Sequence, residues 1–445
     1  MATKVDTVSS SKKRTNWTVM IKMTTSIWRS STKCLLLAPL LATTVSCGYA
    51  SSSKPAPLVA PAFGDVEAKR SIQEDNRVSQ AGMDALEQFS MHTASRILSE
   101  GQGNTLYSPY SLYVALALAA SGAEGATQKE MLSLLGGSSP GNISRLAADT
   151  GKLIRLLHTD NEIGRLKTAN SLWIQQGHSF KKEYEKLASA SFYASLHQAD
   201  FAQKETAEKM GEWVREHTGG QITPAIQPNP QQVMALLNTL DFKDEWSDAF
   251  NESQTAQGVY YPEEGGQLEA AFMSRNYYTA DYFKGDRFAS ATLRLKTGGA
   301  MTFVLPDKGV SVKELVDTPE KTRALLPVSG KTTYKLDLKV PKFDYSSELE
   351  LVQALKVMGM KTPFTDQANF SLMSDTPVFI SQITQSTHIA IDEKGVEAAA
   401  FTQILMAGSG MPKGETAELI LDRPFLYSIT AANGTILFTG ICRSP

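Results

Sequence analysis

Cysteine is scarce in this sequence, with only three in 445 residues. If a leader is removed at Cys47, two cysteines remain, Cys47 and Cys442. One further cysteine cannot build a disulfide framework, so the folded chain must be stabilised by a buried apolar core, which a domain of this size can supply. We expect Cys442, close to the C-terminus, to be a small buried apolar side chain.

An excess of one charge is also lacking. The 44 basic residues nearly balance the 46 acidic ones, and the formal net charge is -2. Nothing therefore draws the chain toward nucleic acid, and we expect no nucleic-acid partner. Apolar residues make up 42% and charged residues 20%, as in an ordinary soluble domain. There is no internal repeat of fixed period.

Catalytic motifs are missing as well. The sequence contains no His-Glu-x-x-His, no Cys-x-x-Cys and no phosphate-binding loop ending in Gly-Lys-Ser/Thr. Residues 407–411 are similar to a nucleophile elbow but lack the first glycine of Gly-x-Ser-x-Gly, which disfavours a hydrolase that uses Ser409. The six histidines form no pair at ligand spacing. We therefore expect no enzyme, no metal and no cofactor.

The N-terminal segment has the pattern of an export signal. Basic residues precede an apolar run at 34–42, which is too short to span a bilayer but suits a signal peptide. Small residues then lead to Cys47, so the segment resembles a bacterial lipoprotein signal, in which cleavage exposes a cysteine for lipidation. Thr44 stands where such signals usually have leucine. The alternative is ordinary signal-peptidase cleavage a few residues later.

Three regions follow from this pattern. We expect a lipoprotein-like signal peptide at 1–47, a flexible linker rich in Ser, Pro and Ala at 48–77, and one domain at 78–445, because no Pro/Gly-rich linker divides the last stretch. The protein would be exported to the extracellular space or the cell envelope. A lipidated Cys47 would attach it to a membrane.

Periodicity predicts both helices and strands. Helical spacing occurs at 81–99, 112–121 and 207–217, and the second stretch is apolar on nearly all sides. Strand patterns occur at 299–306, 334–340, 425–430 and 435–440. The last two flank Asn433-Gly434, a strong hairpin signal. Because helices and strands do not alternate regularly, an α+β fold is favoured.

The segment at 389–415 is the most informative. A strand-like run reaches a glycine, then small residues, then a stretch rich in Gly, Met and Pro. By composition alone it is a surface loop with a short helical piece. Its central octapeptide consists of Glu393, Lys394, Gly395, Val396, Glu397, Ala398, Ala399 and Ala400.

This octapeptide resembles the hinge of the serpin family, which has the form Glu-x-Gly-Thr/Ser/Val-Glu-Ala-Ala. Other segments resemble serpin motifs in the same order, among them Asn-x-x-Phe-Ser-Pro-x-Ser and Asn-Ala-x-x-Phe-Lys-Gly-x-Trp. They are residues 104–111, 169–172, 213–222, 237–246, 341–343, 358–360 and 423–427. No single match is specific for the family, but the occurrence of all of them in the same order over 78–445 is specific.

The resemblance implies the serpin fold, with three β-sheets, about eight or nine helices and an exposed reactive loop near the C-terminus. It implies a monomer that inhibits serine-type proteases as a suicide substrate. The protease cuts the loop, and the cut loop enters the main sheet and traps the acyl-enzyme. A non-inhibitory serpin that acts as a binding or chaperone protein is the alternative.

Family spacing from Gly395 implies a reactive bond at Ser409-Gly410. If the family pattern is aligned on Met411-Pro412 instead of Gly395, the reactive bond shifts by one residue. Met406-Ala407 is a third candidate for the bond. A small residue at the bond implies an elastase-like or subtilisin-like target. Strand alternation in an inserted loop would turn one set of side chains inward, all small or apolar: Val396, Ala398, Ala400, Thr402 and Ile404. Glu397 would face solvent.

Four residues match the family's shutter, which closes the main sheet: Ser108, Ser111, Asn238 and Gln385. Gln385 stands where most animal serpins have a histidine that bonds to the asparagine. Because glutamine donates and accepts hydrogen bonds, we expect it to maintain a latch with Asn238. Asp244 replaces a usual glycine, and we expect a local change of turn there.

Overall fold

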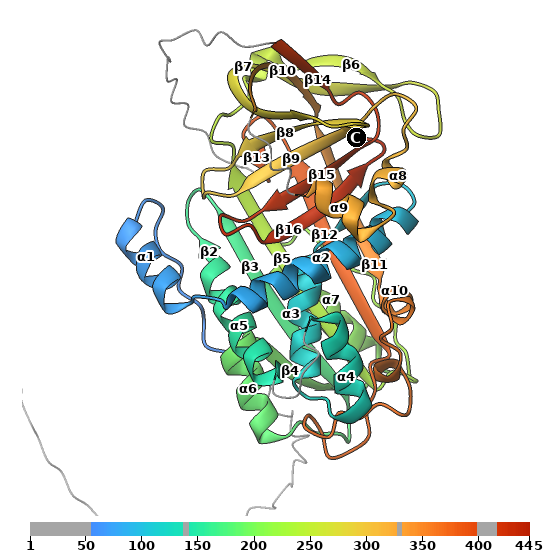
Figure 1. The fold of residues 1–445 in the computed structure, drawn as a ribbon. Helices are drawn as coiled ribbons and strands as arrows, with labels where there is room; N and C mark the ends of the chain where they lie inside the picture. Colours follow the sequence, from blue (N-terminus) through green and yellow to red (C-terminus); the bar gives the residue numbers. More distant parts are fainter. Residues whose placement is uncertain (1–54, 137–141, 327–331, 398–415) are drawn as a thin grey trace, which may run out of the picture. The chain divides into compact units, whose positions relative to one another are not determined.

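The computed structural model describes residues 55–136, 142–326, 332–397 and 416–445 (Figure 1). Ten α-helices occur in these ranges: α1 (Val66–Asp75), α2 (Gln80–Glu100), α3 (Pro109–Ala120), α4 (Gly125–Leu134), α5 (Asn142–Leu157), α6 (Lys182–Phe192), α7 (Lys204–His217), α8 (Val312–Val316), α9 (Pro319–Leu325) and α10 (Val352–Val357). The helices predicted at 81–99 and 207–217 are confirmed as parts of α2 and α7.

Helix α3 lies at the centre of the main core. Ser108 caps it by accepting a hydrogen bond from the Ser111 amide, and Pro109 occupies its first turn, where a missing N–H costs nothing. All twelve of its residues are buried, as the apolar run at 112–121 predicts. It packs against strands of both sheets described below.

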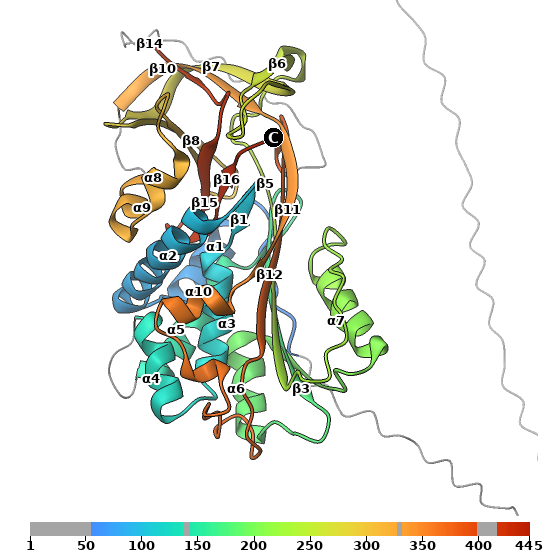
Figure 2. The same cartoon turned by 90° about the vertical axis from the view of Figure 1, so that its right-hand side faces the viewer.

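Seven strands form one sheet, in the order β11 (Phe343–Glu350), β12 (Gln382–Ile391), β13 (Gly395–Val396), β5 (Met234–Glu245), β3 (Arg165–Gln175) and β2 (Thr159–Asp160), with β4 (Ala194–Ala199) also pairing with β3. Figure 2 shows α3, α5 and α6 on one face of this sheet and α7 on the other. Helices therefore lie on both faces of the sheet. Its central strand β5 is buried along almost its whole length, whereas the edge strand β11 alternates between buried and more exposed residues.

Nine strands form the second sheet, in the order β1 (Thr105–Tyr107), β16 (Ile436–Cys442), β15 (Phe425–Thr430), β9 (Ala300–Pro306), β8 (Phe288–Arg294), β7 (Leu268–Lys284), β10 (Thr332–Pro341) and β14 (Thr416–Ile420), with β6 (Ala256–Tyr260) on β7. The predicted hairpin is confirmed, since Gly434 adopts φ 85° in the turn between β15 and β16.

The α+β class is confirmed, but two element counts differ from those that the serpin resemblance implies. The described strands form two hydrogen-bonded sheets rather than three, because the 17-residue strand β7 pairs along most of its length with β10 and, at its end, with β8. One long strand thus joins two sets of strands. Ten α-helices occur in the described ranges rather than eight or nine, and α8, α9 and α10 have fewer than eight residues each.

The stretch 48–77, expected to be a flexible linker, contains helix α1. The Asp65 carboxylate caps this helix by accepting a hydrogen bond from the Ala68 amide. Just after the helix, Asn76 Oδ1 accepts a hydrogen bond of 2.6 Å from Arg155 Nε on α5. The helix is explained by its N-cap and by this contact with α5. The Ser, Pro and Ala content of the stretch, on which the prediction of a linker rested, detects neither. The boundaries at residues 47 and 77 stay predictions.

Cys442 is fully buried on β16 and unpaired, which confirms the prediction of a small apolar side chain. Burial raises the pKa of its thiol well above the usual value. Among the described helices, none has both the length and the apolar character needed to cross a membrane. The described residues contain no cluster of His, Cys, Asp and Glu suited to a metal ion.

Candidate functional site

The site is the boundary between β5 and β12 in the seven-stranded sheet, which we call the seam. The two strands run parallel and pair over only four residues each, with Gln382 opposite Ala235 and Gln385 opposite Asn238. Beyond Gln385 and Asn238, toward β13, the two strands continue side by side without pairing with each other in the described chain. This interval comprises residues 386–390 of β12 and 239–243 of β5. We call this unpaired interval the slot.

The upper end of the slot is closed by β13. This two-residue strand pairs with both neighbours, Val396 lying opposite Ile391 on β12 and opposite Asp244 on β5. The Val396 side chain is buried in the main core. The expected hinge residues Gly395 and Val396 thus already lie between the two central strands.

A tight turn connects β12 to β13. Asp392 Oδ1 accepts hydrogen bonds from the amides of Lys394 and Gly395, at 2.8 and 3.1 Å. Trp246, directly after β5, bonds to this turn twice: its amide donates to Lys394 O and its indole Nε1 to Asp392 O, each at 2.9 Å. Trp246 therefore ties the end of β5 to the hinge, a role that its place in a sequence motif does not reveal.

Glu393 anchors the same turn from its other side. Its carboxylate accepts hydrogen bonds from Thr255 Oγ1 at 2.7 Å and from Lys342 Nζ at 2.9 Å. Burial alone would raise the pKa of Glu393, but these two donors hold it below its usual value. The first acid of the hinge octapeptide is thus an ionised anchor, held by Thr255, which precedes β6, and by Lys342, which lies between β10 and β11.

Gly395 approaches β5 too closely for any side chain. A Cβ built on this residue would lie 2.2 Å from the carbonyl oxygen of Asp244 and 2.8 Å from the Cα of Glu245. Because both contacts are with backbone, neither neighbour can rotate away. The glycine of the hinge motif is therefore required by packing in this position.

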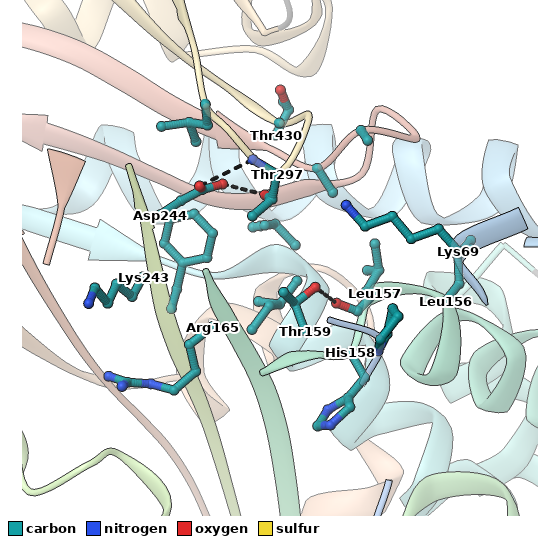
Figure 3. Close-up of a pocket in the computed structure, with 18 of the residues that line it drawn as sticks. Lys69, Leu156, Leu157, His158, Thr159, Arg165, Lys243, Asp244, Thr297 and Thr430 are labelled. Atoms are coloured by element: carbon teal, nitrogen blue, oxygen red, sulfur yellow. Dashed lines mark hydrogen bonds between the residues drawn. The ribbon is translucent and has the colours of Figure 1, made fainter. Parts of the chain in front are cut away.

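Asp244 lies inside β5, so the change of turn expected from its replacement of glycine is wrong. Its carboxylate accepts hydrogen bonds from Thr297 Oγ1 and from the Thr297 amide, the latter at 3.3 Å (Figure 3). These bonds explain how an acidic side chain that is only 1% exposed fits here. Burial raises the pKa of Asp244 to about 6, although the hydrogen bonds oppose the rise.

Glu397 is buried beside other acids. Its φ is 54°, and its side chain is only 8% exposed, with a carboxylate oxygen 3.8 Å from His388 Nε2. Strand alternation predicts a solvent-facing Glu397 in an inserted loop, but in this state the flanking strands cover the side chain. Burial, followed by the nearby Asp241 carboxylate, raises its pKa to about 7.

The shutter residues meet beneath the lower end of the slot, but in a different arrangement from the expected one. Gln385 Oε1 accepts from the Ser108 amide at 2.7 Å, and Gln385 Nε2 donates to Ser108 O at 2.9 Å. Ser108 Oγ accepts from the Ser111 amide at 3.2 Å and donates to Leu437 O at 2.6 Å. Gln385 therefore latches β12 to the start of α3.

The expected hydrogen bond between Gln385 and Asn238 is absent from the described residues. Asn238 Nδ2 instead donates to Asn170 Oδ1 at 2.7 Å, and Asn170 Nδ2 donates to Phe192 O at 3.4 Å. Asn238 Oδ1 is buried with no hydrogen-bond partner in the described chain. Gln385 thus bonds to the Ser108 backbone with both ends of its amide, and Asn238 pairs with Asn170 instead. Sequence matching included Asn170 but gave it no role.

Several predicted site residues lie outside the described ranges. They are Ala398, Ala399, Ala400, the reactive bond Ser409-Gly410, and Cys47.

Comparisons with known proteins agree with this geometry. The family model named serpin (serine protease inhibitor) matches residues 84–445. Serpin-ZX of Arabidopsis thaliana is 29% identical over 379 residues, which cover 80% of this chain and 97% of that protein. Serpin-ZXA of Oryza sativa subsp. japonica is 30% identical over 366 residues, which cover 77% and 90%.

A solved structure of Arabidopsis AtSerpin1 in its native stressed conformation matches with a TM-score of 0.73 and 26% identity, over 83% of this chain and 100% of that one. These relatives are plant proteins, so they give no support to a bacterial lipoprotein. The ordered motifs, the fold and the family match agree, and the chain belongs to the serpin family, a family of protease inhibitors and not of enzymes.

Proposed function

We propose that this protein inhibits serine-type endopeptidases as a suicide substrate, and that its loop, once cut, enters the slot as a new strand of the seven-stranded sheet. The observation that carries the proposal is β13. Its two residues already occupy the upper end of an interval in which β5 and β12 are not paired with each other in the described chain. Insertion then continues a pairing that exists rather than starting one.

The register of β13 supports insertion. Val396 pairs antiparallel with Asp244, so the following residues would lie opposite successively lower residues of β5. Ala398 would then lie opposite Phe242, and Ala400 opposite Leu240. Phe242 and Leu240 belong to the main core, and small inward residues fit against them without displacement.

The same register places Thr402 opposite Asn238. Because Asn238 Oδ1 is buried without a partner among the described residues, a threonine hydroxyl beside it would supply the missing donor. Insertion would also add about a dozen backbone hydrogen bonds, at roughly 0.5–1.5 kcal/mol net each. These terms favour the inserted state, while the shutter and the hinge anchors oppose its formation before cleavage.

The target class rests on the loop sequence. A serine at the proposed bond, Ser409-Gly410, suits proteases with shallow primary pockets, elastase-like or subtilisin-like. Lys413 is the one basic residue near the bond and lies beyond it, which disfavours a trypsin-like target.

Incubation of the mature protein with an elastase, a subtilisin and a trypsin tests the proposal. We expect a covalent adduct that survives a denaturing gel with one of the first two proteases, and a released peptide that begins at Gly410. Ala398→Arg should convert the inhibitor into a substrate, because the inward arginine would bury a charge at a cost of several kcal/mol. Ala399→Arg, with the side chain on the opposite face, is the matched control and should still trap the protease.

Cleavage without an adduct by all three proteases would favour the alternative, a binding or chaperone serpin. An Ala398→Arg variant that inhibits with unchanged stoichiometry would contradict insertion while leaving inhibition intact.

We also propose that the protein is exported as a monomer and that Cys47 is lipidated after cleavage of the signal peptide. The support for export and lipidation is the sequence of residues 22–47 alone, and the support for the monomer is the serpin resemblance. Expression in a bacterial host with labelled palmitate should yield a labelled envelope protein, and Cys47→Ser should abolish the label. An unlabelled, secreted protein would indicate cleavage by the ordinary signal peptidase. Size-exclusion chromatography with light scattering checks the monomer.

A further inference from the structure

A cavity of about 430 Å³ lies over the seam, on the face of the seven-stranded sheet that α7 covers. Its walls come from Met210 and Val214 of α7, from residues 224–229 that follow this helix, and from the seam strands β5 and β12. Its volume falls within the range of pockets that bind small organic molecules.

The cavity exists because α7 packs tightly on only half of the sheet. Met210, Trp213 and Val214 form an apolar cluster with side chains of β3 and β5, Leu237 among them. On the other side of the seam, β12 presents the short polar side chains of Thr384 and Ser386. These are too small to fill the space beneath α7.

The lining is mainly apolar on the side of α7 and β5. On the side of β12 and β11 it is polar, with Gln382, Thr384 and Ser386 beside Glu348, the one acidic residue of the described lining. Glu348 of β11 lies opposite Ser386 in the antiparallel ladder, so the two side chains share a face of the sheet. Glu348 is exposed, and within the described chain its carboxylate forms neither an ion pair nor a hydrogen bond. None of the described residues that line the cavity is basic. An unpaired carboxylate at the edge of an apolar pocket is complementary to a cation with an apolar body.

We propose that this cavity binds a small organic amine, with its apolar part against Met210, Val214 and Leu237 and its ammonium group beside Glu348. Such a ligand would contact β5, β12 and the segment after α7 together. Since it fits the paired seam, it stabilises the closed sheet and opposes parting of the two strands. This regulatory consequence rests on the proposed function, because only insertion requires the seam to part.

The test measures binding first, without a protease. Full-length protein is titrated with 2-(1-naphthyl)ethylamine and followed by calorimetry, with 1-naphthaleneacetate as the anionic counterpart. We expect one saturable site for the amine and at least about tenfold weaker binding of the acid. Glu348→Gln, an exposed substitution, should weaken amine binding by about fivefold. Glu183→Gln, an exposed acid on α6 at the opposite face, is the matched control and should leave binding unchanged.

The absence of saturable binding, or equal affinity of the amine for wild type and Glu348→Gln, would overturn the proposal. Met210→Trp, which fills the cavity, should abolish binding, and Glu348→Gln remains decisive if that variant does not fold.

The second measurement adds a protease that forms the adduct. Saturating amine should raise the ratio of cleaved protein to adduct, and the effect should be lost in Glu348→Gln. Amine binding with an unchanged ratio would overturn the regulatory part. If no protease forms an adduct, the proposed inhibitory function fails, and the binding result still decides whether the cavity is a ligand site.

Discussion

At the scale of single residues, Gly395 and Glu397 affect the insertion of the hinge into the sheet by different physical means. Gly395 allows β13 to approach β5 because it has no side chain, whereas Glu397 places a carboxyl group among other charges. The charged groups around it are Asp241 and Lys243 of β5, Arg165 of β3, Asp344 of β11 and His388 of β12. One residue therefore favours insertion of the hinge at any pH, and the other makes it depend on pH.

Gly395→Val should expel β13 from the sheet. The added side chain would clash with the Asp244 carbonyl, and overpacking of this kind costs about 1–3 kcal/mol. We expect faster amide exchange at residues 244–246 and 395–396, measured by mass spectrometry, because their ladder and turn hydrogen bonds are lost. Lys394→Ala, at the adjacent position, should leave the exchange unchanged. Protection equal to wild type in Gly395→Val would show that β5 can move aside.

Hinge insertion should weaken as pH rises. The pKa of Glu397 is about 7 when buried, against 4.5 in solvent. For an acid whose pKa is raised by burial, the stabilisation is complete below about 4.5 and is lost as pH rises through about 7, a change of about 3 kcal/mol. Tryptophan emission, sensitive to Trp246 at the hinge, should change over this window.

In Glu397→Gln, which stays neutral, the emission change should disappear. An unchanged transition in this variant would assign it to a group other than Glu397.

At the scale of elements, the seam is closed by a side chain that reaches from one element to another. Gln385 of β12 bonds to both backbone groups of Ser108 at the start of α3, and these residues are 277 positions apart in the sequence. Strand pairing across the seam involves only four residues on each strand. The hydrogen bonds between Gln385 and Ser108 therefore help to keep β12 beside β5 at this end of the seam.

Gln385→Ala should destabilise the native protein by about 1–3 kcal/mol, since it leaves the buried Ser108 amide without a partner, while Ser108 O keeps the helical hydrogen bond from the Leu112 amide. The midpoint of the first urea-induced transition should fall. Gln382→Ala on the same strand is the control, because Gln382 is exposed and its midpoint should stay near that of wild type. Equal midpoints for the two variants would show that water satisfies Ser108.

At the scale of the whole molecule, the native sheet is incomplete. In the described chain, β5 and β12 do not pair with each other along the slot, between β13 and the four-residue pairing that ends at Gln385 and Asn238. At that lower end, Asn238 Oδ1 lies buried without a partner among the described residues. Filling the slot would satisfy these groups. The protein is therefore expected to gain stability when its loop is cut.

Calorimetry before and after loop cleavage measures this gain. About a dozen new hydrogen bonds should raise Tm by roughly 20 °C or more. The cleaved Ala398→Arg variant should show little rise, because its loop stays outside the sheet. If cleaved wild-type protein melts at the same temperature as intact protein, the loop does not insert.

Several elements follow from the sequence because their causes are local. The apolar run at 112–121 requires a buried helix, Asn433-Gly434 requires a tight turn, and the order of weak motifs identifies the family. The same motifs place Ser108 at the start of α3 and Gln385 and the hinge on strands of the seven-stranded sheet, because the fold fixes which element each motif enters.

Other features were decided only by the tertiary structure. Asp244 lies within a strand because Thr297, on the segment between β8 and β9, supplies its hydrogen bonds. Gln385 bonds to Ser108 rather than to Asn238, which pairs with Asn170 instead. Helix α1 depends on a contact with α5, and the cavity over the seam depends on how α7 packs. Each of these involves partners far apart in the chain, and local sequence patterns determine which residues are present but not which distant groups they meet.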